Sequence, residues 1–173
     1  MLAEASGWIA EHANHSIVFG RNMQRLERLA NRYGNHGLKV RQLDYTQTEQ
    51  LRSVVVDSYM QYGEIDMVVA WIHGTAPDAI QTIKNQLSDL QKETPWKLIE
   101  VKGSSSHLSN IQTTGQYVQE NCHVKIVQLG FVLDGCTSRW LTHKEISNGV
   151  IQAIKSENNK TIVGTLEPWD RRP

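Results

Sequence analysis

Residues 17–22 read Ile-Val-Phe-Gly-Arg-Asn (IVFGRN) and decide how the rest of the chain is interpreted. A short β-branched and aromatic run of this kind is typical of a strand, and glycine commonly follows the end of one. The apolar residues that come next recur at helical spacing, so the stretch predicts a strand that leads into a helix. Arg21 then stands at the carboxyl end of the strand, where a cation can pair with a phosphate group.

Strand-like and helix-like segments alternate along the whole chain. We expect six strands, at residues 16–20, 38–43, 65–72, 96–103, 124–132 and 161–166. Segment 65–72 is a nearly continuous apolar run, as in a strand that is buried on both faces of a parallel sheet. About six helices separate the strands, the weakest at 108–121. This alternation predicts one α/β domain, residues 1–173, with a doubly wound parallel sheet and helices on both faces.

Helix starts are indicated by capping residues. Asn22 can cap the helix that follows the first predicted strand. Thr46 with Glu49, and Thr142 with Glu145, have the three-residue spacing of a capping box, in which each side chain bonds the backbone of the other. We therefore expect helices to begin at these three places.

Composition restricts the class of protein. Apolar residues make up 39% and charged residues 21% of the 173 residues, which predicts a globular chain with its own core. The formal net charge is zero and no basic stripe stands out, which argues against nucleic acid or an anionic membrane as a partner. No apolar run approaches the ~18 residues of a membrane span, and the first residues lack the basic segment of a signal peptide.

The two cysteines and the histidines give no metal pattern. Cys122 and Cys136 lack the CxxC spacing, and we expect reduced thiols in a cytoplasmic protein, with a disulfide as the alternative. No spacing of histidines, cysteines and carboxylates suggests a metal site.

The candidate site lies where the predicted strands end. In an open parallel sheet, ligands bind beyond the carboxyl ends of the strands, near the point where the strand order reverses. The segments found there are FGRN (19–22), LDYT (43–46), VVAWIHG (68–74), GSSS (103–106) and LGFV (129–132).

These segments, in this order, resemble the short-chain dehydrogenase/reductase family. FGRN resembles the second strand and adenosine-ribose site of that family, and LDYT the acidic residue beside adenine. VVAWIHG takes the place of its Asn-Asn-Ala-Gly segment, GSSS matches the strand end with the catalytic serine, and LGFV resembles the turn that faces the nicotinamide. The resemblance implies a Rossmann-like fold and a nicotinamide cofactor.

The resemblance also implies which residues hold that cofactor. They are Arg21, Asn22, Asp44, Tyr45, Ala70, Trp71 and Gly130. Arg21 indicates NADP rather than NAD, because an arginine pairs with the 2′-phosphate whereas an acid would repel it. The alternatives are a solvated arginine at a helix start for Arg21, and a turn or capping acid for Asp44.

The catalytic residues implied by the resemblance are incomplete. Ser104 fits the family's serine and Tyr117 its tyrosine, thirteen residues later, but Asn121 stands where the family has a lysine. A neutral asparagine cannot lower the pKa of a tyrosine as a lysine cation does. His73 lies where a substrate could approach. Each also has an ordinary interpretation: Ser104 as a strand-end serine, Tyr117 as a half-buried aromatic, and His73 as a surface or hydrogen-bonded histidine.

The first strand and glycine-rich loop of the family have no counterpart here. The opening segment LAEASGWIAEH (2–12) resembles the helix that follows that loop, so we expect a sheet without its first strand. The gap can be closed by direct pairing of strands 16–20 and 65–72, by a strand from another chain, or by residues upstream of the given start. An open sheet favours a homo-oligomer, since unpaired strand edges associate.

Two functions follow from these observations. One is a short-chain dehydrogenase/reductase-like, NADP(H)-dependent oxidoreductase that acts on a small carbonyl or alcohol, with weak or lost activity. The other is a catalytically degenerate module that binds nucleotide or another copy of itself without turnover.

Overall fold

The computed structural model describes residues 1–104, 121–135 and 137–173. Within it the chain divides into two compact units, which are described separately. The N-terminal unit comprises Leu2–Ile65 and Ile72–Lys92, and the C-terminal unit comprises Met1, Asp66–Trp71 and Glu93–Pro173. The prediction that residues 1–173 form one domain stays a prediction.

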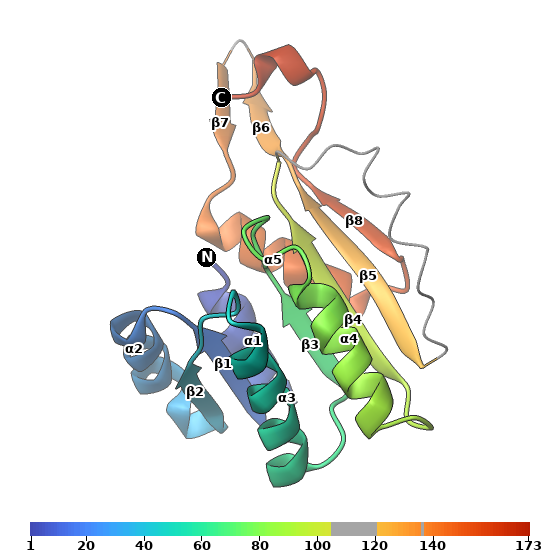
Figure 1. Cartoon of the computed structure of the whole chain (residues 1–173). Coiled ribbons are helices and arrows are strands. Elements are labelled where there is room, and N and C mark those ends of the chain that lie inside the picture. The colour runs from blue at the N-terminus through green and yellow to red at the C-terminus, as the bar shows by residue number, and fades with distance from the viewer. Residues whose placement is uncertain (105–120, 136) are drawn as a thin grey trace. The chain divides into compact units, whose positions relative to one another are not determined.

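The N-terminal unit is built around two parallel strands. Its elements are α1 (Ala3–His12), β1 (Ser16–Gly20), α2 (Met23–Tyr33), the 3₁₀ turn Gly34–His36, β2 (Leu38–Gln42), α3 (Thr48–Tyr62) and α4 (Ala79–Leu90) (Figure 1). Helix α2 connects β1 to β2 and contacts both strands, α1 contacts β1 and α2, and α3 packs on α4. The predicted strands 16–20 and 38–43 are thus confirmed as a βαβ unit.

Helix α2 begins and packs as its sequence indicates. The Asn22 side chain accepts a hydrogen bond from the Arg25 backbone N–H at 2.9 Å, which confirms the predicted cap. Leu26 is buried. A Cβ atom on Gly7 of α1 would collide with the ring of Tyr33, so glycine at this position leaves room for that ring against α1.

The C-terminal unit contains a four-stranded parallel sheet in the order β3-β4-β5-β8. These strands are Met67–Ala70, Trp96–Lys102, Cys122–Leu129 and Lys160–Val163. Helix α5 (His143–Lys155) packs against β4, β5 and β8. The structure therefore confirms an α/β fold with a parallel sheet. The core is made of side chains with 0–2% exposure, namely Trp96, Leu98, Ile99, Val101, Val127 and Val150.

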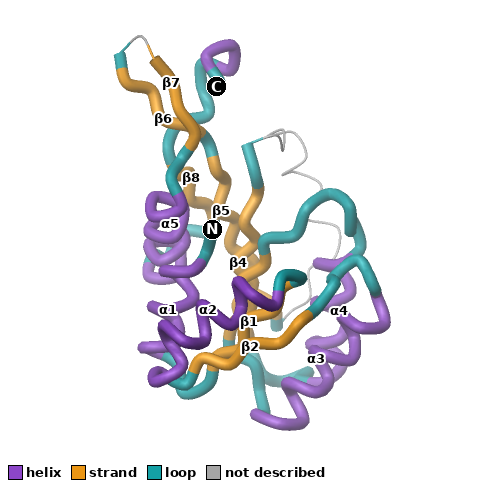
Figure 2. Tube along the Cα trace, turned by 90° about the vertical axis from the view of Figure 1, so that its left-hand side faces the viewer, coloured by secondary structure: helices purple, strands orange, loops and turns teal. Residues whose placement is uncertain are grey.

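The described residues contain eight strands rather than the six predicted. The expected strand 124–132 was wrong in its extent, because β5 ends at Leu129 and a new strand, β6 (Phe131–Asp134), pairs antiparallel with β7 (Thr137–Trp140). This hairpin is separate from the parallel sheet (Figure 2). The break falls at Gly130, after which Phe131 forms an antiparallel bridge with Thr165. The predicted helix 108–121 lies, but for its last residue, outside the described residues.

One predicted capping box is absent and the other is present. Helix α3 begins at Thr48, and no side chain caps it; Thr46 bonds Asp44 instead, so the box expected from Thr46 and Glu49 was wrong. At α5, the Thr142 hydroxyl accepts from the Glu145 N–H, and the Glu145 carboxylate accepts from the Thr142 N–H at 2.7 Å. That box is confirmed.

A buried lysine closes the other end of α5. Lys125 is 5% exposed, and its ammonium donates to the backbone carbonyls of Ala153 and Ser156, which lie at the end of that helix. The last carbonyls of a helix carry partial negative charge and lack intrahelical partners. The lysine therefore supplies both the missing donor and a compensating charge.

Among the helices of the described part of the chain, none has the length and apolarity needed to span a membrane.

The Glu145 carboxylate gives the C-terminal unit a pH-dependent contact. It accepts two 2.9 Å hydrogen bonds from the guanidinium of Arg139 besides those of the capping box. The Arg139 guanidinium, followed by the Thr142 backbone and hydroxyl, lowers the pKa of Glu145 from an ordinary 4.5 to about 2. A carboxyl with a lowered pKa stabilises the fold above its unfolded pKa, and this contribution disappears as the pH falls through its folded pKa.

We expect Glu145→Gln to lower the free energy of unfolding at pH 7. The difference from the wild type should shrink as the pH falls from about 4.5 toward about 2. Urea unfolding followed by circular dichroism over a pH series measures it. Glu49→Gln is the matched control, because the Glu49 side chain is 84% exposed and does not cap α3. A difference that stayed constant down to pH 2 would contradict this account.

Candidate functional site

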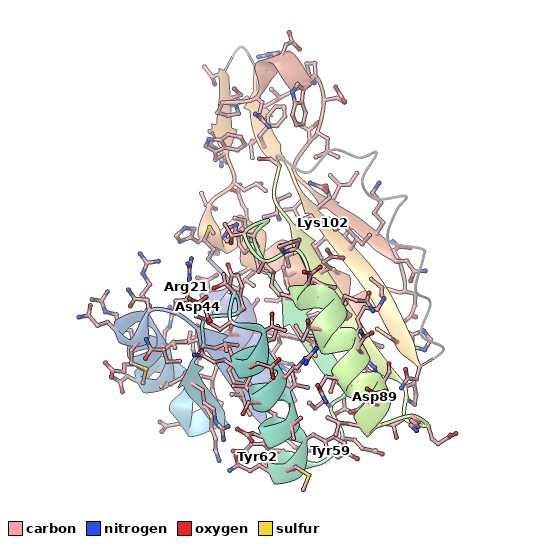
Figure 3. All side chains as sticks on the ribbon, viewed as in Figure 1. Arg21, Asp44, Tyr59, Tyr62, Asp89 and Lys102 are labelled. Carbon is pink, nitrogen blue, oxygen red and sulfur yellow. The ribbon has the colours of Figure 1, made fainter. Side chains whose placement is uncertain are left out.

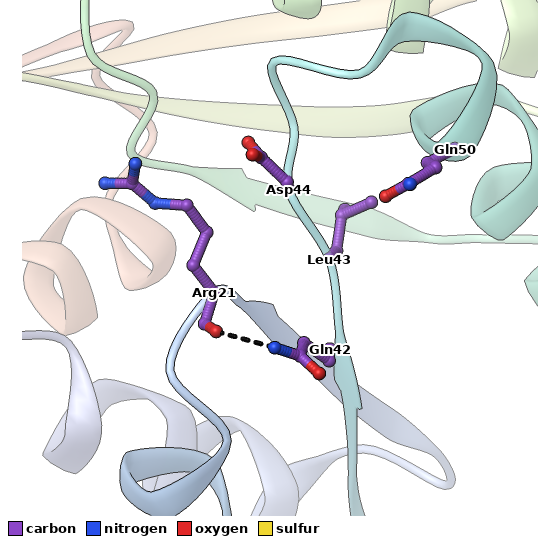
Figure 4. Close-up of a pocket in the computed structure, with 5 residues that line it drawn as sticks. All are labelled: Arg21, Gln42, Leu43, Asp44 and Gln50. Atoms are coloured by element: carbon purple, nitrogen blue, oxygen red, sulfur yellow. Dashed lines mark hydrogen bonds between the residues drawn. The ribbon is translucent and has the colours of Figure 1, made fainter.

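The carboxyl ends of β1 and β2 meet at a pocket in the N-terminal unit. Its volume is about 410 Å³, within the about 300–1,000 Å³ typical of small-molecule sites. The lining residues are Arg21, Gln42, Leu43, Asp44 and Gln50 (Figure 4). Parallel register aligns Gly20 with Gln42, so the residues that follow each strand come together here.

Arg21 and Asp44 carry the charges of this pocket. Figure 4 shows them on the two segments that leave β1 and β2. The Arg21 backbone carbonyl accepts a 3.0 Å hydrogen bond from the Gln42 side chain, which fixes the chain at this point. No ion pair of the Arg21 guanidinium is found among the residues that the structure describes, and the group lies 5.7 Å from the centre of the Tyr45 ring. An exposed guanidinium over a concave surface is suited to an anionic ligand.

Asp44 is held as a carboxylate by the turn that follows it. The Thr46 hydroxyl and backbone N–H donate to one of its oxygens at 2.7 and 3.1 Å. These two bonds, the hydroxyl first, lower the pKa of Asp44, and the nearby Arg21 charge adds to the effect. One oxygen of Asp44 is therefore used in the turn, as the alternative interpretation of a turn acid expected. The other oxygen can still accept a hydrogen bond at the pocket.

Two lining residues were missed by sequence analysis. Gln42 is the last residue of β2 and comes directly before the strand-end segment LDYT (43–46) that was considered. Gln50 lies in the first turn of α3, one residue after the stretch 46–49 that was interpreted as a capping box. Asn22 was placed among the cofactor residues, and the structure shows its side chain in the cap of α2.

In the C-terminal unit, the strand ends gather a second polar group. Lys102 ends β4, and its ammonium lies 3.4 Å from the Glu100 carboxylate, with both side chains about 15% exposed. Gln128 lies beside Lys102 in the parallel register, and its amide donates to the Gly103 carbonyl at 2.9 Å. Figure 3 labels Lys102 at this end of β4. The pair was not predicted, although alternating charges in WKLIEVK (96–102) were visible in the sequence.

The structure brings some of the predicted catalytic and nicotinamide residues to this edge. Ser104 comes two residues after the end of β4 and is half-buried. Ala70 is buried at the end of β3, and half-buried Trp71 follows it. His73 is exposed, and its carbonyl accepts from Ala76 in a turn of the N-terminal unit. Tyr117 lies outside the described residues. The predicted catalytic roles of Ser104, Tyr117 and His73 stay predictions.

Gly130 is required by close backbone packing. It follows β5, and a Cβ atom there would collide with the Thr165 carbonyl. Its N–H donates to the Val163 carbonyl at 2.9 Å. The glycine therefore allows the chain to cross close to the segment after β8, which explains its presence without a ligand.

Among the described residues, no group of three or more histidines, cysteines or carboxylates could hold a metal ion.

Comparisons with known proteins identify the fold. No family model matches the sequence, and no curated protein matches it. Solved structures do match: an alcohol dehydrogenase from the archaeon Thermococcus sibiricus, complexed with 5-hydroxy-NADP, has a TM-score of 0.70 at 14% identity over 98% of this chain and 92% of that one. The fold is Rossmann-like.

Two further structures show how far that conclusion reaches. A gluconate 5-dehydrogenase from Burkholderia cenocepacia, in complex with NADP and tartrate, has a TM-score of 0.68 at 15% identity over 94% of this chain and 88% of that one. A ribose-5-phosphate isomerase from Brucella melitensis has 0.67 at 12% identity over 94% and 86%. The two dehydrogenases are short-chain dehydrogenase/reductases, so the resemblance is confirmed at the level of the fold. The isomerase shows that this fold does not determine the reaction.

We expect Gly130→Ala to destabilise the C-terminal unit strongly, because its methyl group has no space against the Thr165 carbonyl. Gly103→Ala is the matched control. Gly103 follows the neighbouring strand β4, and a Cβ atom there meets no described residue within 4 Å. Thermal unfolding of the two variants should show a lower midpoint for Gly130→Ala alone. Equal midpoints would contradict the packing argument.

Proposed function

We propose that this chain binds NADP(H) in the pocket of the N-terminal unit, as a short-chain dehydrogenase/reductase-like protein. The observation that carries the proposal is the Arg21 side chain at the carboxyl end of β1, lining a pocket of about 410 Å³. Two of the structures with the same fold are complexes with NADP or a derivative of it. Ligands of open parallel sheets bind at this end of the strands.

The pocket residues have chemistry that suits the adenosine half of NADP. The Arg21 guanidinium supplies paired donors for the 2′-phosphate. The Asp44 carboxylate, kept ionised by Thr46, supplies an acceptor for the exocyclic amine of adenine. Tyr45 is half-buried, and the centre of its ring lies 5.7 Å from the Arg21 guanidinium, which places it near the same ligand. The predicted cofactor contacts of Ala70, Trp71 and Gly130, which belong to the C-terminal unit, stay predictions.

The proposed reaction is hydride exchange with a small carbonyl or alcohol, at a weak rate or not at all. Bound cofactor would supply the hydride. Ser104 would hydrogen-bond the substrate oxygen, and Tyr117 or His73 would donate its proton. Asn121 is the residue that argues for lost turnover, because it cannot provide the charge that lowers a tyrosine pKa. The second candidate function, nucleotide binding without turnover, has the same pocket and lacks this step.

We expect Arg21→Ala to weaken NADPH binding roughly ten- to a hundredfold and to leave NADH binding unchanged. A hydrogen-bonded charge pair contributes about 1.5–3 kcal/mol, and NADH has no 2′-phosphate. Isothermal titration calorimetry with both cofactors measures this. Arg32→Ala is the matched control, because Arg32 is exposed at the other end of α2 and does not line the pocket. Absence of NADPH binding to the wild type would refute the proposed function.

Turnover distinguishes the two candidate functions. NADPH oxidation with a panel of small aldehydes and ketones, abolished in Ser104→Ala, would support the oxidoreductase. Saturable NADPH binding without oxidation would support the degenerate module.

Assembly and compartment are part of the proposal. Each of β1 and β3 is paired on one edge only within the described sheets, and an unpaired edge can associate with another copy. We infer a homo-oligomer, which sedimentation equilibrium would test, and a monomer would contradict it. We also infer action in the cytoplasm, where thiols such as those of Cys122 and Cys136 stay reduced.

A further inference from the structure

Helix α2 carries a row of arginines that the net charge of the chain conceals. Arg25, Arg28 and Arg32 follow one another at intervals of three and four residues, and all three are exposed. At 3.6 residues per turn they lie within about 60° of one another around the helix. We call them the arginine stripe. The sequence-based statement that the chain has no basic stripe was therefore wrong for this helix.

The stripe is not neutralised by its own surroundings. None of its arginines forms an ion pair with another residue in the described ranges, although Arg32 lies 5.0 Å from the centre of the Tyr33 ring. The one acid of the helix, Glu27, is two residues from Arg25 and so lies on roughly the opposite side.

The position of the stripe is unfavourable for an isolated helix. Like charges three and four residues apart repel each other. The first turn of α2 contains Arg25 and no acid, so a cation stands at the end of the helix where the backbone dipole is positive. An anionic partner would relieve both the repulsion and the dipole effect.

The choice of cation points to phosphate. Every basic side chain among the first 38 residues other than histidine is arginine, since the first lysine of the chain is Lys39. A guanidinium binds phosphate oxygens through two parallel hydrogen bonds, and it is less strongly hydrated than an ammonium. Three guanidinium groups in a row, spread over about 10 Å of helix, suit a ligand with regularly repeated phosphates.

A membrane surface fits the stripe less well. Peripheral helices insert large apolar side chains beside their basic residues. Met23 is the large apolar side chain of α2 that is exposed, at 39%, and its place in the sequence puts it roughly opposite Arg25. The face that carries the arginines therefore offers charge without an apolar anchor.

We propose that the arginine stripe binds nucleic acid through its phosphate backbone, without reading base sequence. The expectation that nucleic acid is not a partner rested on the net charge of zero, and a local row of exposed arginines is the more direct observation. The proposal leaves Arg21 aside, so it stands or falls separately from cofactor binding.

The test is fluorescence anisotropy of a labelled 20-nucleotide single-stranded RNA titrated with the full chain, with a DNA duplex of the same length in parallel. We expect binding that weakens with salt, with a slope of log K against log salt of about −2 for three neutralised phosphates on a single strand. Arg25→Glu with Arg28→Glu should reduce the affinity at least about tenfold at 50 mM salt and flatten the slope.

The control has the same change of charge elsewhere. Lys144→Glu with Lys160→Glu reverses two exposed lysines of the C-terminal unit. Because salt screens the change in net charge, this pair should bind RNA within about twofold of the wild-type affinity. Arg25→Gln with Arg28→Gln is the milder pair, in case charge reversal unfolds α2, which circular dichroism would reveal. Loss of binding in the control pair to the same extent would overturn the proposal.

Three further outcomes would also overturn it. The first is no binding of either nucleic acid by the wild-type chain at 50 mM salt. The second is binding of polyglutamate as tight as that of RNA, which would indicate an acidic protein as the partner. The third is binding to vesicles of phosphatidylcholine and phosphatidylserine with no binding of RNA, which would indicate a membrane surface.

Discussion

The parallel ladder between β4 and β5 is the interaction on which the C-terminal unit depends. It aligns seven residue pairs, from Trp96 with Cys122 to Lys102 with Gln128, and β4 is paired on its other edge with β3. Leu98 and Ile99 point to opposite faces of the sheet, and both are fully buried. A slip of one residue would exchange the two faces and place both side chains in packing environments built for the other. Because the register is fixed in this way, the segments after β4 and β5 must end at the same edge.

In the N-terminal unit, a parallel register likewise fixes where the strands end, with fewer strands. Five residue pairs align β1 with β2, and the last of them, Gly20 with Gln42, determines where Arg21 leaves the strand. The Asn22 cap then starts α2 one residue later. Arg21 and the arginine stripe are therefore presented by consecutive parts of one short segment, the first at a pocket and the second on an open helix face.

Periodicity and capping residues predicted much of the fold, and contacts between distant residues explain what they missed. The strands around Val18, Val68 and Ile99 were found because their apolar runs are local signals. The end of β5 was not found, since it depends on the approach of Thr165 to Gly130, 35 positions away in the chain. The Asp-Gly pair 134–135 was a local hairpin signal that was not used.

The candidate site was predictable to a similar degree. Strand ends pointed to Arg21 and Asp44, because the position of a ligand site follows from the topology of a parallel sheet. Gln42 and Gln50 were missed because a glutamine in a strand or helix has no distinctive pattern, and it becomes part of a site only through the neighbours that folding supplies. The arginine stripe was also missed, because the net charge of zero sums over the whole chain. A helical projection of α2 shows the three arginines on one side.

The buried ammonium of Lys125 makes this one side chain a reporter of the state of its unit. Amine-reactive reagents modify lysines that solvent can reach, and Lys125 reaches solvent only when α5 separates from β5. Lys160, on the neighbouring strand β8, is exposed in the folded chain and would be modified at any time. The ratio of labelling at these two residues, read by mass spectrometry, would therefore follow local opening of the sheet under native conditions.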